Sequence, residues 1–318
     1  MRIAVLGSGG IGGYYGVQLA RGGHDVVFIA RAAHLEAMQR RGLTILTAAG
    51  ESTVPVRAIA DTRGADPVDL VLFCVKSYDT TAAARTLEPL LAPDTAVLTL
   101  QNGLASAAEV AAAAGGSTSV LSGSVYVALQ IAGPGVIRHT GGDGKIVFGE
   151  VGGAATGRAE RIATAFQRAG IPHVLSADIA EVLWEKFLFI TGVGAVTALA
   201  RSGIGPLMKS AEGRSLVTAS CEEVAAVGRR EGHLLRSNAV DAVVAQAAAL
   251  PPEWRSSMAR DLADGRRLEV EALSGGVVRR GRAHGIPTSV HQAIVACLSL
   301  HQPPVSASRA TPAAPAVA

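Results

Sequence analysis

The sequence has little charge and little cysteine, and each shortage excludes a class of protein. Only 17% of the 318 residues are charged, and the net charge of +3 is dispersed, which disfavours a basic surface for nucleic acid. The three cysteines, Cys74, Cys221 and Cys297, lie far apart, without the spacing of a zinc site or a disulfide framework. We therefore expect buried thiols in a reducing compartment, no metal and no nucleic-acid partner.

Long hydrophobic runs are also missing. The apolar run at residues 1–6 is too short for a signal peptide, and glycines follow it at once. Residues 187–200 are apolar but too few to span a bilayer, so they predict a buried helix. With 49% hydrophobic residues the chain can bury large cores, which excludes global disorder. The sequence thus predicts a folded cytoplasmic protein without a membrane partner.

A glycine-rich turn follows the first apolar run. Its residues, Gly7-Ser8-Gly9-Gly10-Ile11-Gly12, have the G-x-G-x-x-G spacing of dinucleotide-binding proteins. The first glycine permits the tight turn, the second lets the backbone approach a pyrophosphate, and the third lets a helix pack close to the strand. That helix would present its unpaired N–H groups to the phosphates. A glycine-rich turn without a ligand is the alternative, but the apolar strand before it and the apolar helix after it favour nucleotide binding.

The residue that ends the second expected strand distinguishes between two nicotinamide cofactors. In the usual fingerprint an acidic residue stands there and binds the ribose 2′-hydroxyl. This chain has Arg31 instead, and a guanidinium can pair with a 2′-phosphate that a carboxylate would repel. The sequence therefore favours NADPH/NADP over NAD. The alternative is that Arg31 merely ends a strand in solvent.

The first half of the chain alternates short β-branched runs with alanine-rich segments. Such alternation predicts an α/β fold, a Rossmann-type doubly wound parallel sheet covered by helices. Strands are expected at residues 3–6, 26–29, 70–75 and 96–100, and helices at 12–21, 33–41, 80–91 and 105–113. Further short strands, separated by Gly/Pro turns, would be antiparallel additions to the sheet edge at 119–130, 135–139 and 145–149.

A domain boundary is expected near residue 176, where the pattern changes. Residues 1–176 would be an NADP-binding Rossmann-type domain, and residues 177–301 an all-helical domain for substrate binding and dimerisation. Asp178 is a plausible N-cap for the first of its helices, which are expected at 178–200, 208–232, 240–250, 252–284 and 290–301. The tail, residues 302–318, is rich in Pro, Ala and Ser, which predicts disorder.

Two expected strands end in polar residues. Lys76 follows residues 70–75, and Asn102 follows residues 96–100. Ligands of open α/β sheets lie beyond the carboxyl ends of the strands. Lys76 could therefore meet a phosphate or an acidic substrate, and Asn102 could bond the nicotinamide ribose or a substrate hydroxyl. Strand ends are also where turns and solvent begin, so position alone leaves both readings open.

The helical half holds two further candidates. Lys186 stands directly before an apolar segment, and partial burial would lower its pKa and make it a proton donor near neutral pH. The residues alone favour the alternative, a lysine reaching from the helix edge into solvent. Within the expected helix 252–284, Ser257 and Asp261 would share a face, and Glu269 would stand about 18 Å beyond Ser257 at ~1.5 Å per residue. These residues could line one cleft or an ordinary solvated surface.

Several short motifs, at family-like separations, resemble the ketopantoate reductase (2-dehydropantoate 2-reductase) family over nearly the whole chain apart from the tail. The resemblance implies a two-domain fold with the active site between the domains. The matching residues are 7–12, Arg31, Val75-Lys76, Asn102-Gly103, Leu183-Trp184-Glu185-Lys186, Glu222-Glu223-Val224-Ala225, Glu231-Gly232, Ser256-Ser257-Met258 with Asp261, Glu269, and Arg282-Ala283-His284-Gly285-Ile286-Pro287.

The resemblance also implies a reaction and a role for each residue. A nicotinamide would give hydride to the C2 carbonyl of a 2-keto acid, most simply 2-dehydropantoate in pantothenate biosynthesis, while Lys186 gives the proton. Lys76 and Asn102 would hold cofactor and substrate. Ser257 would contact substrate, and Glu269 would be a catalytic residue close to the cofactor.

Three positions depart from the family's pattern. Where the family carries asparagines that grip the substrate, this chain has Ile190 and, near the next two places, Gly194 and Ile204. An apolar residue cannot replace an amide hydrogen bond, and a pocket built on such bonds loses discrimination without them. Two alternatives therefore stay open, a paralogous reductase of another branched or hydrophobic 2-keto acid and a catalytically silent NADP-binding sensor. Retention of Lys186 and Glu269 disfavours the sensor.

Overall fold

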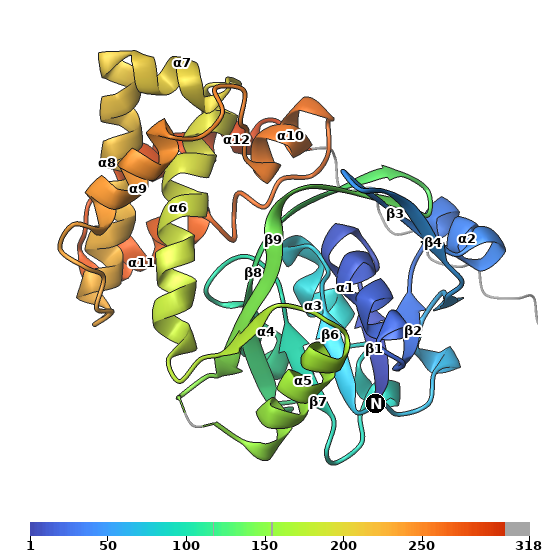
Figure 1. Ribbon diagram of the computed structural model, residues 1–318. Coiled ribbons are helices and arrows are strands. Elements are labelled where there is room, and N and C mark those ends of the chain that lie inside the picture. Colours follow the sequence, from blue (N-terminus) through green and yellow to red (C-terminus); the bar gives the residue numbers. More distant parts are fainter. Residues whose placement is uncertain (117, 154, 303–318) are drawn as a thin grey trace, which may run out of the picture.

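The computed structural model describes residues 1–116, 118–153 and 155–302, so the predicted disorder of 302–318 falls almost wholly outside the described residues. A mixed ten-stranded sheet has the order β4-β3-β9-β8-β7-β6-β1-β2-β5, with β10 paired to β9 (Figure 1). The six strands in the run β5-β2-β1-β6-β7-β8 are parallel to one another, whereas β8 and β9 are antiparallel. The strands are β1 (Arg2–Leu6), β2 (Asp25–Ile29), β3 (Leu43–Thr47), β4 (Gly50–Val54), β5 (Arg57–Ile59), β6 (Leu70–Phe73), β7 (Ala96–Thr99), β8 (Val120–Gly133), β9 (Val136–Glu150) and β10 (His173–Leu175).

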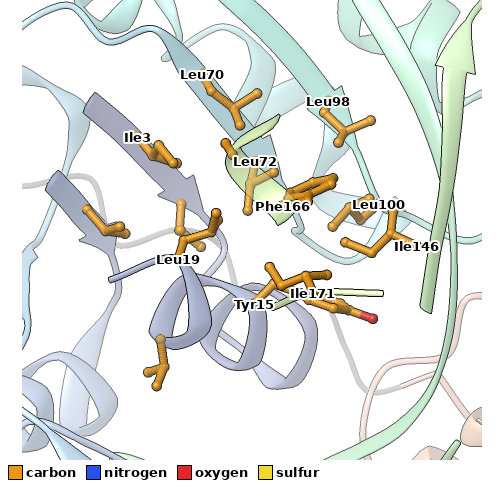
Figure 2. Close-up of a cluster of buried hydrophobic side chains, with 14 of the residues drawn as sticks. Ile3, Tyr15, Leu19, Leu70, Leu72, Leu98, Leu100, Ile146, Phe166 and Ile171 are labelled. Atoms are coloured by element: carbon orange, nitrogen blue, oxygen red, sulfur yellow. The ribbon is translucent and has the colours of Figure 1, made fainter. Parts of the chain in front are cut away.

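Helices cover both faces of this sheet, as the alternating pattern predicts. Along β1, Ile3 and Val5 face one core and Ala4 and Leu6 face another, because successive strand residues point to opposite sides. Figure 2 shows part of the first core, where the side chains of the strands meet those of α1 and α5. Helices α1 (Gly10–Arg21), α2 (Ala32–Arg41) and α5 (Gly157–Arg168) contribute to the first core, and α3 (Thr80–Ala84) and α4 (Ser106–Ala113) to the second.

The second part of the sheet differs from the expectation. The two short strands predicted at 135–139 and 145–149 are one strand, β9, because its ladder with β8 continues past the glycines through register shifts. This strand is not at the edge, since β3 pairs with it on the far side. Strands β3, β4, β5 and β10 went unpredicted. Strand β4 is polar and mostly exposed and β5 has three residues, so neither carries a strong apolar pattern.

Seven helices among the described residues form the C-terminal region, which lies to one side of the sheet in Figure 1. Asp178 caps the first, as predicted, and its side chain accepts a hydrogen bond from the Glu181 N–H at 3.2 Å. They are α6 (Ile179–Leu199), α7 (Ile204–Lys209), α8 (Ala211–Arg230), α9 (Ala239–Ala248), α10 (Ser257–Ala263), α11 (Ser274–His284) and α12 (Ser289–Ser299). The fold is thus an α/β sheet domain followed by a helical C-terminal region.

Helix α6 is the core of this region and confirms the helix expected at 178–200. By length and composition it is the one helix of the described chain that could cross a membrane, but 61% of its most apolar window is buried inside the protein. Its residues Phe187, Val193 and Val196 pack in one cluster with Val224 of α8 and Val277 of α11.

Three helix predictions were wrong in extent. The helix expected at 252–284 is two helices, because Gly265 adopts a left-handed φ of 64° just after α10 and the chain stays irregular until Ser274. The helix expected at 80–91 ends at Ala84 and gives way to a 3-10 turn. The segment 208–232 is divided by Ser210, which caps α8.

Candidate functional site

The glycine-rich turn between β1 and α1 packs against the chain just before Lys76. Gly7 has a φ of 98°, and a Cβ there would lie 2.6 Å from the backbone nitrogen of Val75, so no other residue fits. Gly9 caps α1 without a side-chain hydrogen bond, which leaves the first N–H groups of the helix open to an anion. These features fit the pyrophosphate of a dinucleotide.

His34 holds the turn in place, a role that sequence reasoning missed. Its Nε2 donates to the carbonyl of Ser8 at 2.9 Å, and its Nδ1 accepts from the N–H of Gly135 at 3.0 Å. Burial lowers the pKa of His34, which favours the neutral ring that this pair of bonds requires. The hydroxyl of Ser8 donates in turn to the carbonyl of Ile29 at 2.9 Å, which ties the turn to the end of β2.

Arg31 lies two residues beyond Ile29, at the same end of the sheet as the glycine-rich turn. It caps α2 and is exposed. The next residue, Ala32, has a φ of 49°, a left-handed conformation that is uncommon for alanine and turns the chain into the helix. A guanidinium in this position is accessible to a ligand bound along the turn.

Lys76 connects the sheet to the helical region. Its Nζ donates to Asp261 Oδ2 at 2.9 Å and to Glu269 Oε2 at 3.0 Å, and Glu269 Oε1 accepts from the N–H of Ser77 at 2.9 Å. Burial alone would lower the pKa of Lys76, but the two carboxylates outweigh it and raise the pKa above its usual value. The predicted placement of Glu269 far along a helix was therefore wrong, because after Gly265 the chain folds back to the same ammonium as Asp261.

Lys186 approaches the same region from α6. Its Nζ donates to the carbonyl of Val125 on β8 at 3.0 Å, and it lies 6.0 Å from the ring centre of Tyr126. Burial lowers the pKa of Lys186 to about 8, and the nearby Glu269 opposes that shift. Between the pairs Tyr126–Lys145 and Val127–Gly142, Asp143 and Gly144 of β9 are left unpaired, which marks a bulge in β9 beside this contact.

Asn102 lies in the turn after β7 and is half-buried. In the part of the chain that the structure describes, its side-chain amide makes no hydrogen bond. A Cβ on the following Gly103 would lie 3.7 Å from the carbonyl of Ala272, which places this turn beside the segment that carries Glu269. The neighbouring Gln101, which sequence reasoning missed, fixes the turn by donating to the carbonyl of Val75 at 3.0 Å.

The remaining candidates do not share the contacts of the lysines. Ser257 is exposed at the start of α10. A Cβ on Gly194 would lie 3.1 Å from the Cβ of Ser256, so this glycine serves a close contact between α6 and α10, and Ile204 is fully buried in the helical core. Of the three departures only Ile190, half-buried and one helical turn beyond Lys186, can lie on the same side of α6 as that lysine.

Among the described residues no group of three His, Cys, Asp or Glu side chains could hold a metal ion. A Rossmann-type sheet, an open glycine-rich turn and a half-buried lysine with a lowered pKa together define a dinucleotide-dependent oxidoreductase.

Comparison with known proteins gives the family. Residues 3–153 match the family "Ketopantoate reductase PanE/ApbA", and residues 178–302 match its C-terminal part. The chain is 36% identical to a 2-dehydropantoate 2-reductase of Halobacterium salinarum, over 95% of this chain and 99% of the relative, and 30% identical to that of Mesorhizobium japonicum, over 93% and 96%. The structure of a PanE/ApbA family ketopantoate reductase from Ralstonia eutropha JMP134 superposes with a TM-score of 0.87 at 36% identity, covering 95% of this chain and 98% of that one. The chain therefore belongs to the ketopantoate reductase family and is an oxidoreductase that uses a nicotinamide cofactor.

Proposed function

We propose that the protein reduces 2-dehydropantoate to pantoate with NADPH, a step of pantothenate biosynthesis. The relatives that it matches over nearly their whole length are named for this reaction. The observation that carries the proposal is Lys186, whose ammonium is half-buried against the carbonyl of Val125 and whose pKa is lowered to about 8.

Lys186 supplies the proton of this reduction. When bound, the nicotinamide supplies a hydride to the C2 carbonyl carbon of the substrate. One N–H of the ammonium is held by Val125, which leaves two for the substrate. The Nζ–H bond breaks as the new O–H bond forms on the carbonyl oxygen, and the neutral amine regains a proton from water. A pKa of about 8 suits the role, because the group is mostly protonated at neutral pH and still releases its proton readily. Before it gives its proton, the positive charge of Lys186 stabilises the negative charge that develops on the carbonyl oxygen.

Other residues would position the reactants. The free amide of Asn102 can bond the nicotinamide ribose or the substrate hydroxyl, and Ser257 can contact the substrate from α10. Glu269 acts on both lysines, since it pairs with Lys76 and supports the protonated form of Lys186.

The choice of NADPH rests on Arg31. Its exposed side chain follows β2 at the end of the sheet where the glycine-rich turn lies, and a guanidinium there can pair with a 2′-phosphate.

The proposal includes a cytoplasmic homodimer of two-domain subunits, divided near residue 176. The helical region exposes Leu234 and Leu300, which are 85% and 82% accessible and would be covered in an assembly. The three cysteines are free, as a reducing compartment would leave them, but the expectation of buried thiols was right only for Cys221, since Cys74 is half-buried and Cys297 is exposed. Size-exclusion chromatography with light scattering tests the dimer.

A second candidate function is the reduction of another, more hydrophobic 2-keto acid. Tyr126 favours it, because its ring is 37% exposed and lies beside the ammonium of Lys186. Ile190 adds an apolar side chain one turn beyond that lysine, where the family carries an amide. An aryl or branched side chain would bury apolar surface on both residues.

NADPH consumption by the purified protein, with ketopantoate beside a panel of other 2-keto acids, separates the two candidates. Fast and selective turnover of ketopantoate supports the proposed function. A preference for an aryl or larger branched 2-keto acid supports the second candidate function instead. Tight NADPH binding without turnover of any acid contradicts both and favours the sensor.

A further inference from the structure

A cavity of about 230 Å³ lies between the end of β8 and α10, outside the lysine contacts described above. A water occupies about 30 Å³ in the liquid, so the space holds several waters or a phosphate group. Three of the lining side chains are arginines and one is an aspartate. The lining residues are Gln130, Ile131, Arg255, Arg260, Ala263, Asp264 and Arg266.

The cavity adjoins the glycine-rich turn. The Cδ1 atom of Ile131, in the cavity wall, lies 3.8 Å from the position that a Cβ on Gly9 would take. Leu129, two residues earlier, lies with its Cβ 3.1 Å from the same position on Gly10. Gly9 and Gly10 begin α1, where the backbone of this motif approaches a pyrophosphate. Only the side chain of Ile131 would therefore separate a ligand on the turn from the cavity that the arginines line.

The three guanidinium groups differ in what they already bind. Arg266 is occupied, since it pairs with Asp261 Oδ1 at 2.8 Å and Asp264 Oδ2 at 2.7 Å. Arg260 is half-buried and donates to the carbonyl of Arg255 at 2.7 Å. Neither Arg255 nor Arg260 forms an ion pair with a carboxylate anywhere in residues 1–116, 118–153 and 155–302. Arg260 of α10 and Arg255 just before it thus line the cavity without an ion pair of their own, although the carboxylate of Asp264 lies in the same wall.

Partial burial makes the charge of Arg260 costly unless an anion binds, whereas Arg255 is exposed. Desolvation lowers the pKa of Arg260; the nearby carboxylates of Asp261 and Asp264 oppose that shift, and Arg266 adds to it. A desolvated cation without a partner costs free energy, which a bound anion offsets. Guanidinium groups suit phosphate oxygens in particular, because they can donate two parallel N–H bonds.

We propose that Arg255 and Arg260 form a phosphate subsite that binds the pyrophosphate of the dinucleotide from the helical side, opposite the N–H groups of the glycine-rich turn. The inference rests on the proposed function in assuming a nicotinamide dinucleotide. It adds a phosphate contact from the helical region to that of Glu269, which the resemblance places close to the cofactor.

The test compares the dissociation constants of NADPH and NADH for the wild type and Arg255→Gln, measured by isothermal titration calorimetry. Both cofactors contain the pyrophosphate, so both constants should rise by a similar factor of about 10, the loss that corresponds to ~1.4 kcal/mol. Inorganic pyrophosphate should also bind more weakly to the variant. Arg161→Gln, the same change at an exposed position of α5, is the matched control and should leave all three constants unchanged.

Arg260→Gln is a second variant, with circular dichroism to confirm folding, and should act in the same direction. Unchanged binding of both cofactors and of pyrophosphate in the two variants would overturn the proposal. If only the dissociation constant of NADPH rose, the arginines would bind the 2′-phosphate and the proposal would be overturned. If only the KM of the keto acid rose, they would bind the substrate carboxylate, which would also overturn it. Equal weakening of both cofactors in a protein that reduces no keto acid would uphold the subsite while refuting the proposed function.

Discussion

The sheet domain and the helical region each direct one lysine at Glu269, and the two lysines have opposite properties. Lys76, at the end of β6, binds two carboxylates, which raise its pKa. Lys186, on α6, binds a neutral carbonyl, and burial lowers its pKa to about 8. The same side chain is therefore held charged in the sheet domain and near its titration point in the helical region.

This difference separates binding from proton transfer. A lysine locked between carboxylates can position a segment or attract an anion, but it releases a proton with difficulty. A lysine whose charged form is poorly solvated releases one readily. Groups whose environments drive their pKa values apart are the usual mark of assigned acid and base roles. We therefore expect changes in the sheet domain to alter binding and stability, and changes at Lys186 to alter turnover.

The largest effect should follow from Lys186→Ala. Removal of the proton donor should lower kcat by roughly 10²–10⁴-fold while NADPH binding is retained, as measured by steady-state kinetics and titration. Lys209→Ala, at an exposed position of α7, is the matched control. Wild-type turnover by a folded Lys186→Ala protein would remove the distinction between the two lysines.

Lys76→Met should act mainly on stability. It leaves Asp261 and Glu269 facing each other without their shared cation, and breaking a buried ion pair costs about 3–5 kcal/mol. Because the Lys76 side chain is 42% exposed, we expect the free energy of unfolding in urea to fall by about 1–3 kcal/mol instead. The double variant with Glu269→Gln should lose less than the sum of the single changes. Full additivity would show that the pair does not interact.

Arg31→Glu should change binding alone. The carboxylate should raise the dissociation constant of NADPH by about 10-fold or more and change that of NADH little, since only NADPH has a 2′-phosphate. Equal losses for both cofactors would exclude Arg31 from 2′-phosphate recognition.

Glu269→Gln offers the finest test, because this carboxylate acts on both lysines. It opposes the lowered pKa of Lys186, so its removal should lower that pKa further. The high-pH limb of the kcat/KM profile should then move to lower pH. A limb that stays in place, or moves to higher pH, would show that Glu269 has no electrostatic effect on the proton donor.

The local parts of the fold were predictable from sequence, and the reason is visible in particular residues. The turn at Gly7 and the N-cap at Asp178 depend on neighbours within a few positions, so their signals are contained in short motifs. The break after α10 depends on a single glycine, Gly265, within an otherwise helical composition, and it was missed. The continuous strand β9 was missed because its glycines are typical of turns, whereas its ladder with β8 keeps it extended.

The site was predictable only in part. The sequence marked Lys76 and Asn102 by their places at strand ends, whereas Lys186 was favoured by the family resemblance and not by its residue pattern alone. Sequence alone could not show which partners these lysines would meet, because those contacts join segments far apart in the chain. Lys76 meets Glu269 across 193 positions, and Lys186 meets the carbonyl of Val125 across 61. Backbone carbonyls leave no trace in the residue type, and the hydrogen bond that holds Lys186 is made to one, while burial lowers its pKa.

The dependence of kcat/KM on pH in the wild-type protein, with NADPH and ketopantoate or the preferred keto acid, tests the central claim most directly. If Lys186 with its pKa of about 8 is the proton donor, kcat/KM should be level below that pH and fall about tenfold per pH unit above it. The fall should be absent from the residual activity of Lys186→Ala. A wild-type profile that stays level well above pH 8, or a fall that persists in the variant, would contradict the assignment.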